Sequence, residues 1–276
     1  MDDHPGPSST DRERGPVFIM GCQRSGTTLL TLILSMHPAV RAIDEPDTRF
    51  HLVSGETAQL DFDLVKAASL QQRALLVFKA PRDTHRIDEL FSYFQNARLL
   101  WLTRPVEPVV ASMCKLRVTT DSWAFTHAPR EARKYLQAFP ADVSFADAFS
   151  MAELQERSRE QEIMLATLCW IAKERSRGYA WSKHRAALQV IGYVDLVQSP
   201  NATTRRVCRF IELAWTPAVL NHHRVLRGEH IGGTKSQRPI DTSSLERWRS
   251  ELSTDDLNVL RHTIALCGAM SAGPSM

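Results

Sequence analysis

A glycine-bounded segment near the N-terminus has the spacing of a phosphate-binding loop. Residues 21–28 read GCQRSGTT, after a short apolar run and before a helical pattern. Gly21 and Gly26 permit a tight turn in which backbone N–H groups face an anion. The Walker A loop of nucleoside triphosphatases has a lysine after its second glycine. In this chain Thr27 occupies that position, and Arg24 is the cation of the loop. The segment predicts a site for an anionic group that an arginine helps to hold.

The predicted strands end in residues that do not suit a metal-dependent nucleoside triphosphatase. Such an enzyme ends a later strand in an aspartate that helps to hold Mg²⁺, whereas these strands end at Lys79, Arg104 and Tyr193. The adjacent His222 and His223 lack the carboxylate or cysteine spacing of a metal site. We therefore expect no metal ion, and an anionic nucleotide that is held by the protein's own cations.

A second anion-binding pattern follows the third predicted strand. Residues 98–104 (RLLWLTR) read as a buried strand that ends in Arg104, and Ser112 comes eight residues later on the predicted helix. An arginine can pair with a phosphate through two N–H groups. A serine two helical turns further on can donate one more hydrogen bond. Taken separately, a surface salt bridge fits Arg104 and helix packing fits Ser112 equally well.

These two segments resemble those of the PAPS-dependent sulfotransferases, in particular the bacterial and tyrosylprotein-like members. FIMGCQRSGTTLL is similar to the family's 5′-phosphosulfate loop, and LLWLTRPVEPVVASMCKL to its 3′-phosphate segment. PAPS, 3′-phosphoadenosine 5′-phosphosulfate, gives up its sulfuryl group and leaves 3′-phosphoadenosine 5′-phosphate (PAP). The resemblance assigns the 3′-phosphate to Arg104 and Ser112. It assigns the 5′-phosphosulfate to the loop residues Gly21, Arg24, Ser25, Gly26, Thr27 and Thr28.

Two further segments extend the resemblance, which runs from about residue 17 to residue 266. Residues 192–213 look like the family's tyrosine-x-aspartate-leucine segment, which implies that Tyr193 packs near the nucleotide, although a buried structural tyrosine fits equally well. Residues 230–252 are similar to a C-terminal loop that closes over PAPS in relatives. Lys235 and Arg238 are then candidates for the phosphates of the nucleotide, against the alternative of solvated loop charges.

Sulfuryl transfer should proceed through a loose, in-line transition state, like phosphoryl transfer. It needs a base for the acceptor proton and a cation near the leaving oxygen. The resemblance implies that Glu45 is the base and that Lys79 stabilises the leaving phosphate beside Arg24. His85 is the rival base because its ordinary pKa is about 6.5, and a histidine at a helix start is its structural alternative. For Glu45 the alternative is a solvated carboxylate before a proline turn.

The elements that must position these groups alternate between apolar runs and helical patterns. This order is typical of an α/β fold, a three-layer sandwich around a central parallel sheet, and the resemblance implies the P-loop-type sulfotransferase fold. The predicted strands are 17–21, 75–79, 98–104 and 187–193. The predicted helices that follow them are 27–36, 87–94, 105–116 and 201–213.

The remaining segments predict one domain with a helical insertion. Residues 151–177 read as one long amphipathic helix, and residues 243–252 and 254–266 as a closing pair. Between these parts, residues 215–239 read as a long functional loop. We expect a disordered tail over 1–15 and a single sulfotransferase domain over 16–276, with the helical insertion around 119–180.

The composition is that of a soluble globular protein. Of 276 residues, 43% are hydrophobic and 24% charged, and a net charge of +3 gives no field that would attract nucleic acid. The longest apolar run, 29–36, is far shorter than the ~20 residues of a membrane span, so we expect no membrane insertion. Five scattered cysteines and the absence of a signal-peptide pattern favour the cytoplasm.

The resemblance implies transfer of a sulfuryl group from PAPS to a hydroxyl or phenol of a small molecule, with a carboxylate as general base, and the anion-binding patterns agree with it. Two alternatives stay open: a non-catalytic nucleotide-binding or scaffold protein, and a P-loop kinase, which the missing lysine and aspartate disfavour. The oligomeric state is not predicted. An aromatic or apolar acceptor is suggested by residues of the insertion that suit a core equally well: Trp123, Phe125, Tyr135, Phe139, Phe145 and Phe149.

Overall fold

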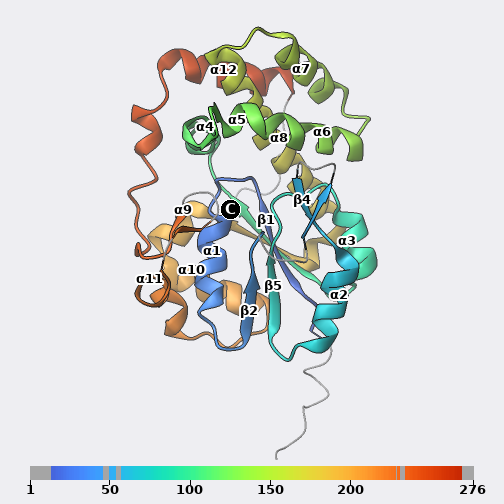
Figure 1. Cartoon of the computed structure of the whole chain (residues 1–276), viewed down its shortest axis with the longest axis vertical. Helices are drawn as coiled ribbons and strands as arrows, with labels where there is room; N and C mark the ends of the chain where they lie inside the picture. Colours follow the sequence, from blue (N-terminus) through green and yellow to red (C-terminus); the bar gives the residue numbers. More distant parts are fainter. Residues whose placement is uncertain (1–13, 46–49, 54–56, 228, 231–233, 269–276) are drawn as a thin grey trace, which may run out of the picture.

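A five-stranded parallel sheet forms the centre of the molecule (Figure 1). The computed structural model describes residues 14–45, 50–53, 57–227, 229–230 and 234–268. The strand order is β2-β5-β1-β6-β9, and all four pairings are parallel. The strands are β1 (Val17–Gly21), β2 (Val40–Ile43), β5 (Leu75–Lys79), β6 (Arg98–Thr103) and β9 (Leu188–Gly192). The prediction of an α/β fold around a parallel sheet is confirmed.

Helices cover both faces of this sheet because successive side chains of each strand point to opposite faces. Val17 and Ile19 of β1 pack with one group of helices, and Phe18 and Met20 with the other. The first group is α1 (Thr27–Ser35), α9 (Tyr193–Gln198) and α10 (Pro200–Phe210). The second group is α2 (Phe62–Gln71), α3 (Ile87–Tyr93) and part of α8 (Arg159–His184). The three layers of the prediction are present.

A separate group of helices lies beyond one end of the sheet, at the top of Figure 1. Its apolar side chains form their own core, and Cys22, just after β1, packs into that core. This layer therefore adjoins the phosphate loop. Its helices are α4 (Val106–Lys115), α5 (Trp123–Thr126), α6 (Ala128–Ala138), α7 (Val143–Leu154), α8 and α12 (Thr254–Leu266).

The prediction of one helix over 151–177 is wrong. α7 ends at Leu154 and α8 begins at Arg159, because the Ser158 side chain accepts the backbone N–H of Gln161 and caps a new helix. The prediction of a helix over 243–252 is also wrong, since that segment contains only a short 3₁₀ turn, η4 (Arg247–Ser250). The final helix, α12, is where the sequence placed it.

Several short elements were not predicted. β2 joins the sheet at its edge, and the loop over 215–239 contains brief helical turns and a two-stranded ladder. These elements are β3 (Phe50–Val53), β4 (Thr57–Leu60), β7 (Arg117–Val118), β8 (Asp121–Ser122), η2 (Arg185–Ala187), η3 (Pro217–Asn221), α11 (His222–Val225), β10 (Glu229–His230) and β11 (Thr234–Lys235). Residues 1–13 of the predicted tail lie outside the described residues. Within the described residues, no helix combines the length and apolar character needed to cross a membrane.

Candidate functional site

The phosphate loop turns sharply between β1 and α1 because two glycines adopt backbone angles that other residues avoid. Gly21 has φ 135°, and a Cβ there would lie 2.3 Å from the carbonyl oxygen of Leu102 on β6. Gly26 has φ 97° and precedes the first residue of α1. Arg24, between them, also has a positive φ of 72°. This local geometry matches the loop that the sequence predicts.

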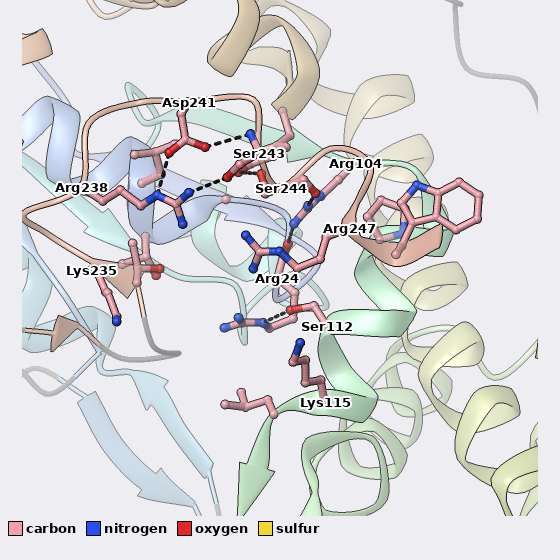
Figure 2. Close-up of a pocket in the computed structure, with 18 of the residues that line it drawn as sticks. Arg24, Arg104, Ser112, Lys115, Lys235, Arg238, Asp241, Ser243, Ser244 and Arg247 are labelled. Carbon is pink, nitrogen blue, oxygen red and sulfur yellow. Dashed lines mark hydrogen bonds and ion pairs between the residues drawn. The ribbon is translucent and has the colours of Figure 1, made fainter. Parts of the chain in front are cut away.

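Arg24 points toward the helix that carries Ser112 (Figure 2). Its Nε donates a hydrogen bond of 2.9 Å to the Ser112 Oγ on α4. Burial lowers the pKa of Arg24 from its ordinary value, with an opposing effect from Tyr193. The sequence assigned Arg24 and Ser112 to different ends of the nucleotide, and the fold brings the two side chains into direct contact.

Arg104 connects the phosphate loop to the C-terminal segment. One terminal nitrogen donates to the backbone oxygen of Arg24 at 2.9 Å, and the other to the backbone oxygen of Ser244 at 2.8 Å (Figure 2). Its Nε is buried and has no hydrogen-bond partner within the described part of the chain. Burial is the main cause of a lowered pKa at Arg104. The Nε is therefore one N–H of Arg104 that no described residue uses.

Tyr193 packs between the loop and Arg104. The Arg104 guanidinium lies 4.3 Å from the centre of the Tyr193 ring, and the tyrosine hydroxyl shares a hydrogen bond of 2.7 Å with the Ser244 Oγ. On the other side, a Cβ at Gly26 would lie 2.4 Å from the ring. Tyr193 therefore supports the shape of the loop, and its predicted contact with a nucleotide stays a prediction.

A basic cavity of about 730 Å³ opens beside the loop. Gly26, Thr27 and Thr28 line it together with Ser112, seven basic side chains and two acidic ones, Asp241 and Glu251. Figure 2 shows several of these cations around one space. The basic side chains are Arg24, Arg104, Lys115, Arg117, Lys235, Arg238 and Arg247. Such a surplus of positive charge suits a polyanionic ligand.

Lys235 and Arg238, the two candidates from the C-terminal loop, both line this cavity. Lys235 is exposed, whereas Arg238 is an ion-pair partner of Asp241 at 2.6 Å and donates a hydrogen bond of 2.6 Å to Ser243. Ser25 does not line the cavity: its side chain is fully buried, and its Oγ has no hydrogen-bond partner among the described residues. Whether any of these residues binds a phosphate stays a prediction.

The sequence reasoning missed three cations of the cavity, Lys115, Arg117 and Arg247. Lys115 lies three residues after Ser112 on α4, so helical spacing could have identified it. Arg247 lies in η4, and its charge contributes to the lowered pKa of Arg104. No local pattern marks Arg247, because it reaches the cavity only when the C-terminal segment folds back over the loop.

A compact ion-pair cluster lies at the end of β5. The Lys79 Nζ donates to the Asp44 Oδ1 at 3.0 Å and to the Glu45 Oε2 at 3.2 Å, and the Arg82 Nε lies 3.4 Å from the Glu45 Oε1. Glu45 and Lys79 are both buried. The pairing of β2 with β5, which opposes Ile43 to Phe78, brings these charges together.

Comparisons with known proteins point to one family. The model of the sulfotransferase family matches residues 16–70. A protein-tyrosine sulfotransferase of Drosophila melanogaster is 22% identical over 287 residues, which cover 92% of this chain and 51% of that protein. The chain is a distant homologue of the sulfotransferases. It spans about half the length of the fly relative.

Solved structures of sulfotransferases share the fold of this homologue. The sulfotransferase domain from the curacin biosynthetic pathway matches with a TM-score of 0.58 at 16% identity, covering 90% of this chain and 97% of the domain. A mouse sulfotransferase complexed with PAP matches with a TM-score of 0.56 at 9% identity, covering 95% and 88%. The predictions of the family and of its P-loop-like fold are confirmed.

The ion-pair cluster places two carboxylates at the end of a strand that the sequence did not predict, because Asp44 and Glu45 directly follow β2. The sequence also assigned both Arg24 and Lys79 to the leaving phosphate. In this structure the Arg24 side chain bonds to Ser112, whereas Lys79 bonds to the two carboxylates. A role for Arg24 in the transfer step stays a prediction.

The surroundings of His85 do not favour it as the rival base. Burial lowers its pKa to about 3, with further contributions from Lys173 and Lys134. It lines a second, small cavity together with Phe139 and Tyr179, away from the basic one. A group with so low a pKa is poorly matched to proton abstraction near neutral pH.

The aromatic side chains that suggested an aromatic acceptor are mostly core. Trp123, Tyr135, Phe145 and Phe149 are buried in the helical layer, and none of them lines the basic cavity. They therefore lend no support to an aromatic or apolar acceptor. Among the described residues, there is also no group of three or more His, Cys, Asp or Glu side chains placed to hold a metal ion.

Proposed function

We propose that this chain transfers a sulfuryl group from PAPS to a hydroxyl group of a small-molecule acceptor. The observation that carries the proposal is the meeting of Arg24, Arg104 and Ser112 in one basic cavity beside the phosphate loop. A nucleotide with phosphate groups at two positions needs cations at both, and the basic side chains of this cavity can supply them. The family relationship supports the same reaction.

The 3′-phosphate would lie near Arg104, Ser112 and Lys115. The buried Nε of Arg104 has no partner among the described residues, so a phosphate oxygen there would satisfy it. Ser25 adds no such support, because its buried side chain does not line the cavity. The Arg104 Nε fits PAPS, because a polar group that is buried and unpaired costs free energy until a partner is supplied.

In the transfer step, the acceptor oxygen forms a bond to sulfur as the bond between sulfur and the bridging oxygen of the 5′-phosphate breaks. Glu45 takes the hydroxyl proton, and PAP leaves. Lys79 lies 3.2 Å from Glu45 and 3.0 Å from Asp44, so neutralisation of Glu45 would remove one of its two ion pairs and make the ammonium a better donor to the leaving oxygen. Arg82, the second partner of Glu45, orients the carboxylate.

Binding and turnover together test the proposal. Isothermal titration of the purified chain with PAP should give a micromolar dissociation constant without added metal, and labelled PAPS should transfer its sulfuryl group to members of a hydroxyl and phenol panel. Glu45→Gln should abolish most of the transfer while PAP binding persists. Glu153→Gln, a change at an exposed glutamate of α7 that pairs with Arg133, is the matched control and should leave both unchanged.

Three outcomes would contradict the proposal. A chain that binds neither PAPS nor PAP at micromolar levels is not this enzyme. Binding of PAP without transfer to any acceptor, by wild-type protein, would favour a non-catalytic nucleotide-binding protein. A larger thermal shift with ATP and Mg²⁺ than with PAP would favour a kinase.

A further inference from the structure

A buried ion pair lies beside the phosphate loop, outside the residues assigned above. Lys173 of α8 and Glu131 of α6 form this pair, and each side chain is only 2% exposed. Burying two charges costs free energy that their attraction does not always recover, so an apolar pair of similar size would often be as stable. A role in conformational specificity is therefore a better hypothesis for this pair than a role in stability alone.

The Lys173 ammonium uses all three of its N–H groups. It donates to the backbone oxygen of Pro81 at 2.9 Å, to the Thr84 Oγ1 at 2.9 Å and to the Glu131 carboxylate. Lys134 adds a contact of 3.3 Å to the other oxygen of Glu131. Burial opposes the charged form of Glu131, but the two lysines outweigh it and lower the pKa to about 2. The pair is thus fully ionised at neutral pH.

The phosphate loop takes part in this network through Gln23. The Gln23 Nε2 lies 3.5 Å from the backbone oxygen of Pro81, and the Gln23 side chain is close enough to Glu131 to contribute to the lowered pKa of that carboxylate. Gln23, Pro81, Lys173 and Glu131 therefore form a closed ring of contacts, which we call the Gln23 ring. Gln23 immediately precedes Arg24 in the chain, so the ring fixes the loop one residue before its cation.

The same ring holds the turn that follows β5. Pro81 lies between Lys79 and Arg82, the two cations that contact Glu45. Ala80 is tied to β1 by a backbone hydrogen bond of 2.8 Å to the Ile19 oxygen. The Gln23 ring therefore joins three parts of the site: the phosphate loop, the turn that carries the cations, and the helical layer.

We propose that the Lys173–Glu131 pair is a positioning device, which holds the phosphate loop in register with the turn over 79–84 so that the loop can bind a 5′-phosphate group. This inference rests on the proposed function. Arg104 and Ser112 lie outside the ring and connect to it only through Arg24, the residue after Gln23, so the device acts mainly on the 5′ side of the nucleotide. That selectivity separates positioning from a general effect on stability.

The test compares two ligands that differ only at the 5′ position, PAP and adenosine 3′-monophosphate. Titration calorimetry is carried out on the wild type and on the double variant Lys173→Met/Glu131→Leu, which replaces the pair by apolar side chains. We expect the double variant to lose at least tenfold in affinity for PAP and less than threefold for the monophosphate. Gln23→Met, which leaves the ion pair intact, should produce the same selective loss and provides the test if the double variant does not fold.

A matched control lies on the same helix. Arg175 of α8 pairs with Asp142, at the start of α7, and contacts no residue of the Gln23 ring in the described chain. Arg175→Met should therefore lower the unfolding midpoint without changing the ratio of the two affinities.

The outcomes separate this inference from the proposed function. If the wild type prefers PAP to the monophosphate and the variants keep that preference, the positioning role is wrong while the function stands. If the variants weaken both ligands equally, the pair is merely structural and the inference is also wrong. If the wild type shows no preference for PAP, the loop holds no 5′-phosphate, which overturns both.

Discussion

Gly26→Ala should lower the free energy of unfolding through two separate costs, one from the backbone conformation and one from packing against Tyr193. The backbone at this position has φ 97°, a region that costs an L-residue roughly 1–2 kcal/mol. In addition, the new Cβ would lie 2.4 Å and 2.7 Å from two carbons of the Tyr193 ring. Overpacking of this kind costs ~1–3 kcal/mol. The expected loss in free energy of unfolding is therefore about 2–5 kcal/mol.

Gly268 provides the control that separates these two costs. It also has a positive φ, 76°, but a Cβ there meets nothing within 4 Å. Gly268→Ala should therefore show only the backbone cost of roughly 1–2 kcal/mol. Urea unfolding of both variants measures the difference, and titration with PAP reports whether Gly26→Ala also weakens ligand binding.

A double-variant cycle identifies the clash itself. If the Tyr193 ring is what meets the new methyl group, Gly26→Ala/Tyr193→Ala should be more stable than the sum of the two single changes predicts. Contacting residues usually show coupling of about 0.5–3 kcal/mol. Additive effects, or equal losses from Gly26→Ala and Gly268→Ala, would refute the packing of Tyr193 on the loop.

Three further predictions concern charge and pH. Glu45→Gln should lower the rate of sulfuryl transfer by ~10²–10⁴-fold, while the PAP dissociation constant, measured by calorimetry, changes less than threefold. An unchanged rate would eliminate Glu45 as the base. Arg104→Met should weaken PAP binding by roughly 10–150-fold, the equivalent of a lost charged hydrogen bond of ~1.5–3 kcal/mol, and equal binding by variant and wild type would remove Arg104 from the site. Burial, and secondarily the nearby lysines, lower the pKa of His85 from 6.5 to about 3. Between these two pH values the unfolded chain binds a proton that the folded chain does not, so the free energy of unfolding falls as the pH drops from 6.5 toward 3. Between pH 7 and pH 5 this group should cost about 2 kcal/mol; urea midpoints of His85→Asn should depend less steeply on pH, and identical slopes would contradict the buried, neutral state of His85.

The parts of the site whose structure depends on residues close together in the sequence could be predicted. The β1–loop–α1 segment was one of these, since its apolar run, its two glycines and its helix start all act within about twenty residues. The end of β6 at Arg104 and the position of Ser112 on α4 follow from the same local patterns. Buried parallel strands read as continuous apolar runs, which made four of the five central strands visible.

The missed elements are those whose signals are weak or non-local. β2 is a four-residue edge strand in which only Ile43 is fully buried, so it lacks a continuous apolar run. The break between α7 and α8 depends on one capping serine inside a sequence that is otherwise helical in pattern. The segment over 243–252 has helical residues, but the carbonyl and the hydroxyl of Ser244 at its start bond to Arg104 and Tyr193, which lie far away in the sequence.

What the sequence determined by itself was the kind of chemistry: a loop for an anion, a second arginine–serine pair, and strands to present them. Only the tertiary structure decided which groups meet. Arg24 lies against Ser112, Glu45 against Lys79, and Gln23 against the pair from α6 and α8. Such contacts join segments far apart in the chain, and they form because strands pair side by side and helices bury their apolar faces, which no short stretch of sequence specifies alone.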